Sequence, residues 1–231
     1  NNSDQYWELG NIVFIQYNRV NDNSLVDLTS KHIDTGFGLE RISAILQGKN
    51  SNYDTDLFYP VIKEVESISN VPYAVNGVSH RVIADHIRLL CFSIADGALP
   101  SNEGRGYVIR RILRRASRFG RNIGLKKPFL HKMVKQIVKM MSDFYPELKE
   151  KQKHIEKVIL SEEESFGKTL DRGLNHFEKI VLKSENQIID GKDAFKLYDT
   201  FGFTIDLTVL MAKEKKINVD VQLPLVEDSN F

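Results

Sequence analysis

The chain has 231 residues, of which 42% are hydrophobic, and its formal net charge at pH 7 is +1. This length and composition provide a sizeable core, enough for one large or two small domains. No apolar run approaches the roughly 20 residues that a membrane-spanning helix requires, the N-terminus has no signal-peptide pattern, and a single cysteine excludes an intrachain disulfide, so we expect a cytoplasmic protein.

The first predicted element is a buried strand over residues 12–17, whose side chains are mainly apolar, β-branched or aromatic. Strand alternation places Asn11, Val13 and Ile15 on one face. We expect a polar loop over residues 21–30 and then a second short strand that leads into DTGFG at residues 34–38. A helix over residues 39–46 completes the order of strand, glycine turn and helix.

The glycine turn could approach a ligand closely, because Gly36 and Gly38 carry no Cβ. Arg41 stands in the first turn of the helix and is aimed back toward the glycines. However, an isolated Gly-x-Gly is also an ordinary structural turn, Asp34 would suit a turn or a cap, and Val13 would suit a core. These residues alone leave a ligand site and a purely structural turn both open.

Helices dominate the remainder of the chain. A helix is predicted over residues 56–67, and residues 70–77 combine proline, glycine and asparagine without a helical period. We therefore expect a domain boundary there, between residues 1–70 and residues 71–231. Further helices are predicted over residues 80–96, 105–124, 129–144 and 154–183; Gly97 would end the first, and interior glycines weaken the continuity of the last.

Neither the cysteine nor the histidines indicate a catalytic or metal site. Cys91 lies in the apolar run of residues 89–94, which predicts packing inside a helix bundle. The six histidines are scattered without a Cys or His partner at zinc-ligand spacing, so we predict no metal site.

Positive charge is concentrated in residues 104–142, which carry twelve Lys or Arg and no Asp or Glu. On a helix the arginines fall on one side and the apolar residues on the other. Guanidinium groups match phosphate geometry, so an exposed row predicts a nucleic-acid backbone as partner. The alternative is a solvated face with i,i+4 ion pairs, but the segment contains no acid to form them. The candidate contacts are Arg105, Arg110, Arg111, Arg114, Arg115, Arg118 and Arg121.

The loop ahead of this helix carries Asn102. Its amide can both donate to and accept from a base edge, which a phosphate-binding arginine cannot do. We therefore expect Asn102 to specify a base and the arginines to position the backbone.

At this point the sequence resembles a known family. Residues 80–88, 95–97 and 100–115, the last reading PSNEGRGYVIRRILRR, closely resemble the helical tRNA-recognition domain of the alanyl-tRNA synthetases. Residues 11–19 with 34–41, and residues 197–203, resemble the same family in the same order. The resemblance, from about residue 6 to about residue 212, implies an α+β fold in which the C-terminal part of a class II antiparallel-sheet catalytic domain precedes a mainly α-helical domain.

The resemblance implies roles for the glycine turn and the strand before it. Residues 34–41 resemble the third signature motif of class II synthetases, in which Arg41, beside Gly36 and Gly38, would contact the ATP phosphates as the catalytic cation. It also implies an alanine pocket, in which Asp34 would accept from the substrate ammonium, Asn11 would orient the substrate and Val13 would wall off its methyl group.

The resemblance further pairs Asn102 with Asp199 as readers of a G·U wobble in the third pair of the tRNA(Ala) acceptor stem. An unpaired guanine amino group in the shallow minor groove would donate to the carboxylate. An ordinary helix-end carboxylate remains the alternative for Asp199. Thr204 stands where the family often has proline, and it could cap the following helix instead.

The resemblance also implies that the chain is part of a longer ligase. An earlier strand and loop with another ATP-binding arginine do not occur in it, so we expect the chain alone to be inactive. The implied partners are tRNA(Ala), alanine, ATP and the rest of the synthetase, with Mg for the parent enzyme and no membrane. A stand-alone RNA-binding module without catalysis, or a DNA-binding protein with its basic helix in a major groove, are the other hypotheses.

Overall fold

The computed structural model describes residues 6–21, 23–73, 77–184 and 187–220. The chain divides into two compact units, Asn1–Pro60 and Val61–Phe231. The sequence predicts the boundary about ten residues later, over residues 70–77, of which 74–76 lie outside the described residues. Within the described ranges, none of the helices is long and apolar enough to cross a bilayer.

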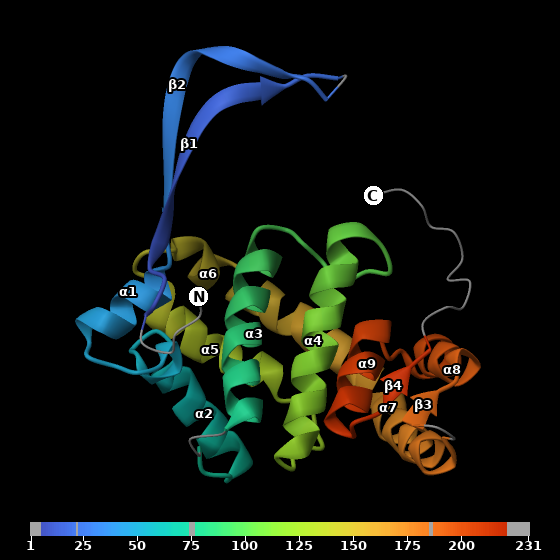
Figure 1. The fold of residues 1–231 in the computed structure, drawn as a ribbon. Coiled ribbons are helices and arrows are strands. Elements are labelled where there is room, and N and C mark those ends of the chain that lie inside the picture. The colour runs from blue at the N-terminus through green and yellow to red at the C-terminus, as the bar shows by residue number, and fades with distance from the viewer. Residues whose placement is uncertain (1–5, 22, 74–76, 185–186, 221–231) are drawn as a thin grey trace. The chain divides into compact units, whose positions relative to one another are not determined.

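The first unit contains an antiparallel ribbon of β1 (Gly10–Arg19) and β2 (Leu25–Phe37), then α1 (Leu39–Leu46) and a 3₁₀ turn at Asn52–Asp54 (Figure 1). This confirms the predicted order of strand and helix. The predicted glycine turn is wrong, because residues 34–37 belong to β2 and only Gly38 separates that strand from α1. The predicted short second strand and polar loop are also wrong, because β2 has 13 residues and starts at Leu25. Residues 25–27 pair with residues 17–19, beyond a register shift at which the extra residues lie in β2, so their backbone groups are satisfied by the ladder.

The ribbon carries large apolar side chains that are exposed on both of its faces. Phe14 is 68% exposed on one face, and Val13, its neighbour on the other face, is 52% exposed. The sequence predicts a buried strand over residues 12–17; the strand is confirmed, but its burial is wrong for this chain. A strand's residue types report its backbone preference, whereas burial depends on what packs against each face.

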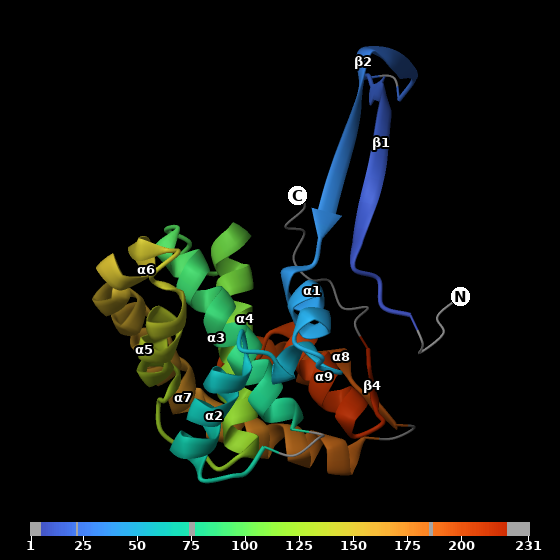
Figure 2. The ribbon, with the colours of Figure 1, turned by 90° about the vertical axis from the view of Figure 1, so that its left-hand side faces the viewer.

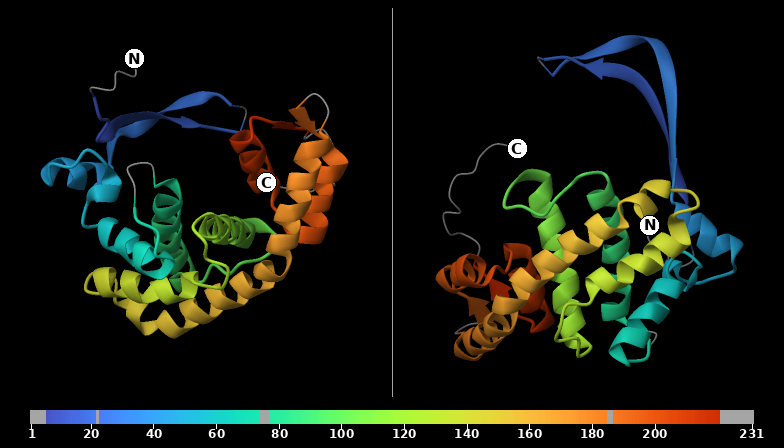
Figure 3. Two further views of the ribbon diagram at one scale, coloured as in Figure 1. Left: turned by 90° about the horizontal axis from the view of Figure 1, so that it is seen from below. Right: turned by 180° about the vertical axis from the view of Figure 1, so that it is seen from behind.

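The second unit is helical, and its predicted helices are confirmed to within a few residues at each end. The elements are α2 (Tyr59–Ser69), α3 (Val78–Ala95), α4 (Gly104–Asn122), α5 (Leu130–Met141), α6 (Pro146–Glu150), α7 (Gln152–Lys183), β3 (Ile188–Ile189), α8 (Gly191–Phe201), α9 (Ile205–Glu214) and β4 (Asn218–Val219), with β3 and β4 parallel. The short α6 and the two short strands are additions to the prediction. Within this unit, α3 lies beside α4, and α7 runs along the bundle from α5 to α8 (Figures 2 and 3).

The apolar face of α4 is buried in the bundle, with Leu113 and Ala116 fully inaccessible to solvent. Cys91 of α3 is also buried, and burial raises the pKa of its thiol, which confirms the predicted interior position. Gly97 adopts a φ of 93° just past the end of α3, so a glycine ends this helix as predicted.

The long helix α7 is continuous through both of its interior glycines. A Cβ at Gly173 would lie 2.3 Å from the ring of Phe203, so glycine is required there for close packing against the segment after α8. The apolar stripe of α7 is part of the core, because Phe166, Leu170 and Phe177 are buried in the cluster that α7 forms with α8 and α9.

Glu163 of α7 caps the N-terminus of α5. Its carboxylate accepts hydrogen bonds from the backbone nitrogens of Phe129 at 2.9 Å and Leu130 at 3.1 Å. Burial raises the pKa of Glu163 to about 7, although these two hydrogen bonds oppose the rise. A buried carboxyl group thus titrates close to neutrality within a helix cap.

We predict that Glu163 makes stability decrease as pH rises. Its folded pKa of about 7 lies above the ordinary glutamate value of 4.5, so the folded state holds the proton more tightly between these values. The contribution is fully present below about pH 4.5 and is lost as pH rises through 7, by up to about 3 kcal/mol. Urea unfolding from pH 4.5 to 8 should show this slope in the parent chain and in the control Glu164→Gln, but not in Glu163→Gln. Parallel curves for all three would contradict the prediction.

Candidate functional sites

The residues predicted to form an amino-acid pocket lie on one face of the β1–β2 ribbon. Asn11 pairs with Gly36, and Val13 pairs with Asp34. Residues directly opposite each other in an antiparallel pair share a face, as do residues two apart along a strand. The structure therefore brings these four residues together, and Asn11, Val13 and Asp34 are all exposed.

Glu8 connects two of the predicted residues. Its carboxylate Oε1 accepts from Asn11 Nδ2 at 2.9 Å, and its backbone carbonyl accepts from Arg41 Nη1 at 2.5 Å. Arg41 lies against Gly38 as predicted, since its Cγ and Cδ are 3.3 Å from where a Cβ on Gly38 would lie. Sequence reasoning missed Glu8, because a carbonyl contact 33 residues along the chain has no sequence signature.

The two glycines of the ribbon, Gly10 and Gly36, differ in the space that a Cβ would have at each position. A Cβ at Gly10 would lie 2.4 Å from the carbonyl oxygen of Gly36, so Gly10 permits the close approach of the two strands. Gly36 itself has open space where a Cβ would lie. Gly36 therefore leaves room for a ligand beside Asn11, whereas Gly10, which the sequence analysis did not single out, has a packing role.

The arginines of α4 do not form the exposed row that the sequence predicts. Five of them are paired with carboxylates from α7 and α9, and Arg118 is only 7% exposed. The acids absent from residues 104–142 come from elsewhere in the chain. The pairs are Arg110 and Arg114 with Glu162, Arg111 with Asp206, Arg118 with Glu214, and Arg121 with Asp171.

The two other arginines of α4 are in different environments. Arg105 is exposed in the first turn and makes no ion pair with any residue that the structure describes. Arg115 is half-buried; together with a stronger hydrogen bond from His86, its charge lowers the pKa of the Asp85 carboxyl group. Arg105 is therefore the arginine of α4 that is most accessible to an external anion.

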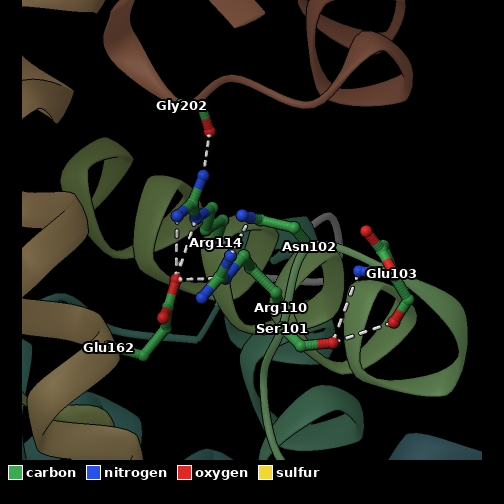
Figure 4. A network of polar contacts seen from close by, with 7 residues as sticks. All are labelled: Ser101, Asn102, Glu103, Arg110, Arg114, Glu162 and Gly202. Carbon is green, nitrogen blue, oxygen red and sulfur yellow. Dashed lines mark hydrogen bonds and ion pairs between the residues drawn. The ribbon is translucent and has the colours of Figure 1, made fainter. Parts of the chain in front are cut away.

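Asn102 is exposed on a fixed loop ahead of α4. Its Oδ1 accepts a hydrogen bond from Arg110 Nη1 (Figure 4). Ser101 donates to the carbonyl of Glu103 at 2.8 Å, and its backbone nitrogen donates to the carbonyl of Gly106 at 3.0 Å. With Oδ1 engaged, the amide nitrogen of Asn102 is the group left to donate to a ligand.

The end of α8 is tied to the same group of residues. Gly202 closes α8 with a φ of 70°, and its carbonyl accepts from Arg114 Nη1 at 2.6 Å (Figure 4). Asp199 lies one turn earlier in α8, with an exposed carboxylate that has no hydrogen bond or ion pair to the described part of the chain. Asn102 and the end of α8 are therefore joined through Arg110, Glu162 and Arg114.

Thr204 occupies the N-cap position of α9, as expected for a capping residue, but its side chain makes no capping hydrogen bond. The backbone carbonyl of Thr204 accepts from Thr208 at 3.0 Å, so the helix starts there without help from the hydroxyl group. The turn after Gly202 thus persists without proline.

Comparisons with known proteins point to one family. The family model described as tRNA synthetases class II (A) matches residues 1–225. Among similar curated proteins are alanine–tRNA ligases from Chlorobium chlorochromatii (51% identity, 92% of this chain and 25% of the relative), Staphylococcus epidermidis (48%, 95% and 26%) and Streptococcus sanguinis (52%, 94% and 26%). The chain thus spans about a quarter of the length of the relatives it matches.

We predict that Arg118→Ala destabilises the chain by about 1–3 kcal/mol. The substitution removes a bidentate ion pair, in which Arg118 Nη1 and Nη2 lie 2.8 and 2.5 Å from the two carboxylate oxygens of Glu214. Glu214 is then left without its partner. Because Glu214 is 39% exposed, water screens part of the loss that a fully buried pair would show. Arg105→Ala, the control on the same helix, should change the free energy of unfolding by less than about 0.5 kcal/mol. Equal effects in urea titrations would contradict this assignment.

Proposed function

The chain belongs to the class II (A) tRNA synthetase family, and on this premise we propose that it is part of an alanine–tRNA ligase that activates alanine with ATP and transfers it to tRNA(Ala). Its first unit would hold part of the alanine and ATP site, and its second unit would read the acceptor stem. The support is an identity of 48–52% to alanine–tRNA ligases over 92–95% of the chain.

The observation that carries the acceptor-stem role is the connection between Asn102 and the end of α8. Arg110 holds the Asn102 amide, and Arg114 holds the carbonyl of Gly202, three residues after Asp199. Glu162 binds both arginines. Two exposed polar side chains from distant parts of the sequence are thereby fixed within one framework, as a composite reader requires.

The two side chains offer complementary hydrogen-bonding groups to a G·U pair. Asp199 carries an unoccupied carboxylate, which can accept from the guanine amino group in the minor groove. Asn102 has its oxygen engaged by Arg110, so its amide nitrogen can donate to the uracil carbonyl. In a G·C pair the guanine amino group is already bonded to cytosine, so this combination favours G·U.

The ribbon face would supply the amino-acid and nucleotide contacts. The Asp34 carboxylate would bind the alanine ammonium, with Val13 opposite it beside the methyl group and Asn11 orienting the substrate. Arg41 would offset phosphate charge as the alanine carboxylate attacks the α-phosphorus of ATP and pyrophosphate leaves. A terminal ribose hydroxyl of the tRNA then attacks the alanyl carbonyl, and AMP leaves.

This chain contributes only part of that chemistry. The exposed apolar residues on both faces of the ribbon, such as Val13 and Phe14, support its being one portion of a wider antiparallel sheet in the full-length ligase. No group of three or more His, Cys, Asp or Glu among the described residues is arranged to hold a metal ion. We therefore assign no ligand in this chain to the Mg²⁺ that accompanies ATP, and no step through it.

We predict that Asn102→Ala and Asp199→Ala, each in the full-length ligase, reduce discrimination between G·U and G·C acceptor stems. Each removes one hydrogen bond to the pair, which corresponds to about 1–3 kcal/mol in the ratio of kcat/KM values. Arg105→Ala should instead weaken binding of both stems and lower the salt dependence of binding, because it would contact phosphate. If both alanine variants at 102 and 199 kept the parent ratio, the reader assignment would be wrong.

A second prediction concerns the ribbon face. Asp34→Asn should raise the KM for alanine in pyrophosphate exchange by about 10- to 100-fold, because a neutral amide binds the ammonium more weakly. Asp27→Asn, an exposed acid on the same strand, is the control and should leave KM within about twofold. An unchanged alanine KM in Asp34→Asn would exclude Asp34 from the pocket.

A further inference from the structure

Glu162 of α7 lies at the centre of the network that holds the two proposed reader segments. One oxygen of its carboxylate, Oε1, lies 3.1 Å from Arg110 Nε, 3.0 Å from Arg114 Nε and 2.9 Å from Arg114 Nη2 (Figure 4). The Glu162 side chain is only 10% exposed, and the side chains of Arg110 and Arg114 are 20% and 16% exposed. The largely buried Glu162 carboxylate thus pairs with the guanidinium groups of Arg110 and Arg114 at the same time.

Each of the two arginines also makes a hydrogen bond to a different segment of the chain. Arg110 donates from Nη1 to Asn102 Oδ1, which fixes the direction of the amide. Arg114 donates from Nη1 to the carbonyl of Gly202, and a Cβ at Gly202 would lie 2.6 Å from that nitrogen. Because Gly202 closes the helix that carries Asp199, the position of Arg114 determines where the end of that helix lies.

The charge of Glu162 is what keeps the two guanidinium groups adjacent. Burial lowers the pKa of Arg114, the attraction of Glu162 opposes this, and the neighbouring Arg110 lowers the pKa further. Without the anion, two like charges would lie next to each other in a partly dehydrated site. The more exposed Arg110 would then turn toward water and release Asn102.

We propose that Glu162 is a positioning residue that sets the geometry of Asn102 relative to Asp199 and thereby determines selectivity for the G·U stem. This inference rests on the proposed function of the two readers. Glu162 does not itself contact the nucleic acid. It acts through Arg110 and Arg114, whose ion pairs within the protein are a framework for recognition.

The test uses Glu162→Gln in the full-length ligase, with aminoacylation of G·U and G·C stems measured separately. Glutamine keeps the length of the side chain but removes the charge. We expect the ratio of kcat/KM for G·U over G·C to fall about tenfold or more, while pyrophosphate exchange with alanine changes by less than about twofold. Glu164→Gln, an exposed neighbour on α7, is the matched control and should leave the ratio unchanged.

A double substitution distinguishes positioning from simple destabilisation. If Glu162 acts through the readers, Glu162→Gln combined with Asn102→Ala should lower the ratio much less than the product of the two single effects. An equal loss on both stems in Glu162→Gln, or multiplicative effects in the double variant, would overturn the positioning role while the reader proposal stands. An unchanged ratio in Asn102→Ala and Asp199→Ala would instead overturn the reader proposal itself.

Discussion

Ion pairs between α4 and the carboxylates of α7 and α9 hold the helical unit together across its most highly charged surface. Arg118 is almost completely buried against Glu214, and Glu162 receives two arginines at once. Such pairs gain little net stability over apolar contacts, because their charges must be dehydrated, but removal of one partner is costly. The arrangement therefore fixes the relative positions of these helices more than it strengthens the fold.

This constraint changes how a nucleic acid would be recognised. A guanidinium group that already has a carboxylate partner adds little net attraction for a phosphate. Arg105 is exposed without such a partner among the described residues and lies three residues after Asn102. In the proposed function, phosphate contacts that position the RNA and base contacts that specify it would both occur near the start of α4, while Arg110 and Arg114 would orient the readers from within the protein.

In the ribbon of the first unit, the pairing of the strands determines where the side chains lie. Its register, not an ion-pair network, brings Asn11, Val13 and Asp34 to one face, and a shift of β2 by one residue would place Asp34 on the face opposite Asn11 and Val13. Its apolar side chains are exposed on both faces, which a soluble protein rarely leaves uncovered. The ribbon therefore gathers the residues of the proposed site on one face, but its apolar side chains are not covered within the described part of the chain.

Local patterns in the sequence determined the long helices of the second unit, the first strand and the helix α1 of the first unit, the burial of Cys91 and the family, because each depends on neighbouring residues or a contiguous motif. Only the tertiary structure decided which anion each arginine meets. The carboxylates that bind Arg114, Arg121 and Arg118 lie 48, 50 and 96 residues away, beyond the reach of any helical spacing rule. Packing of α7 and α9 against α4 thus turned an expected free cationic row into a paired framework.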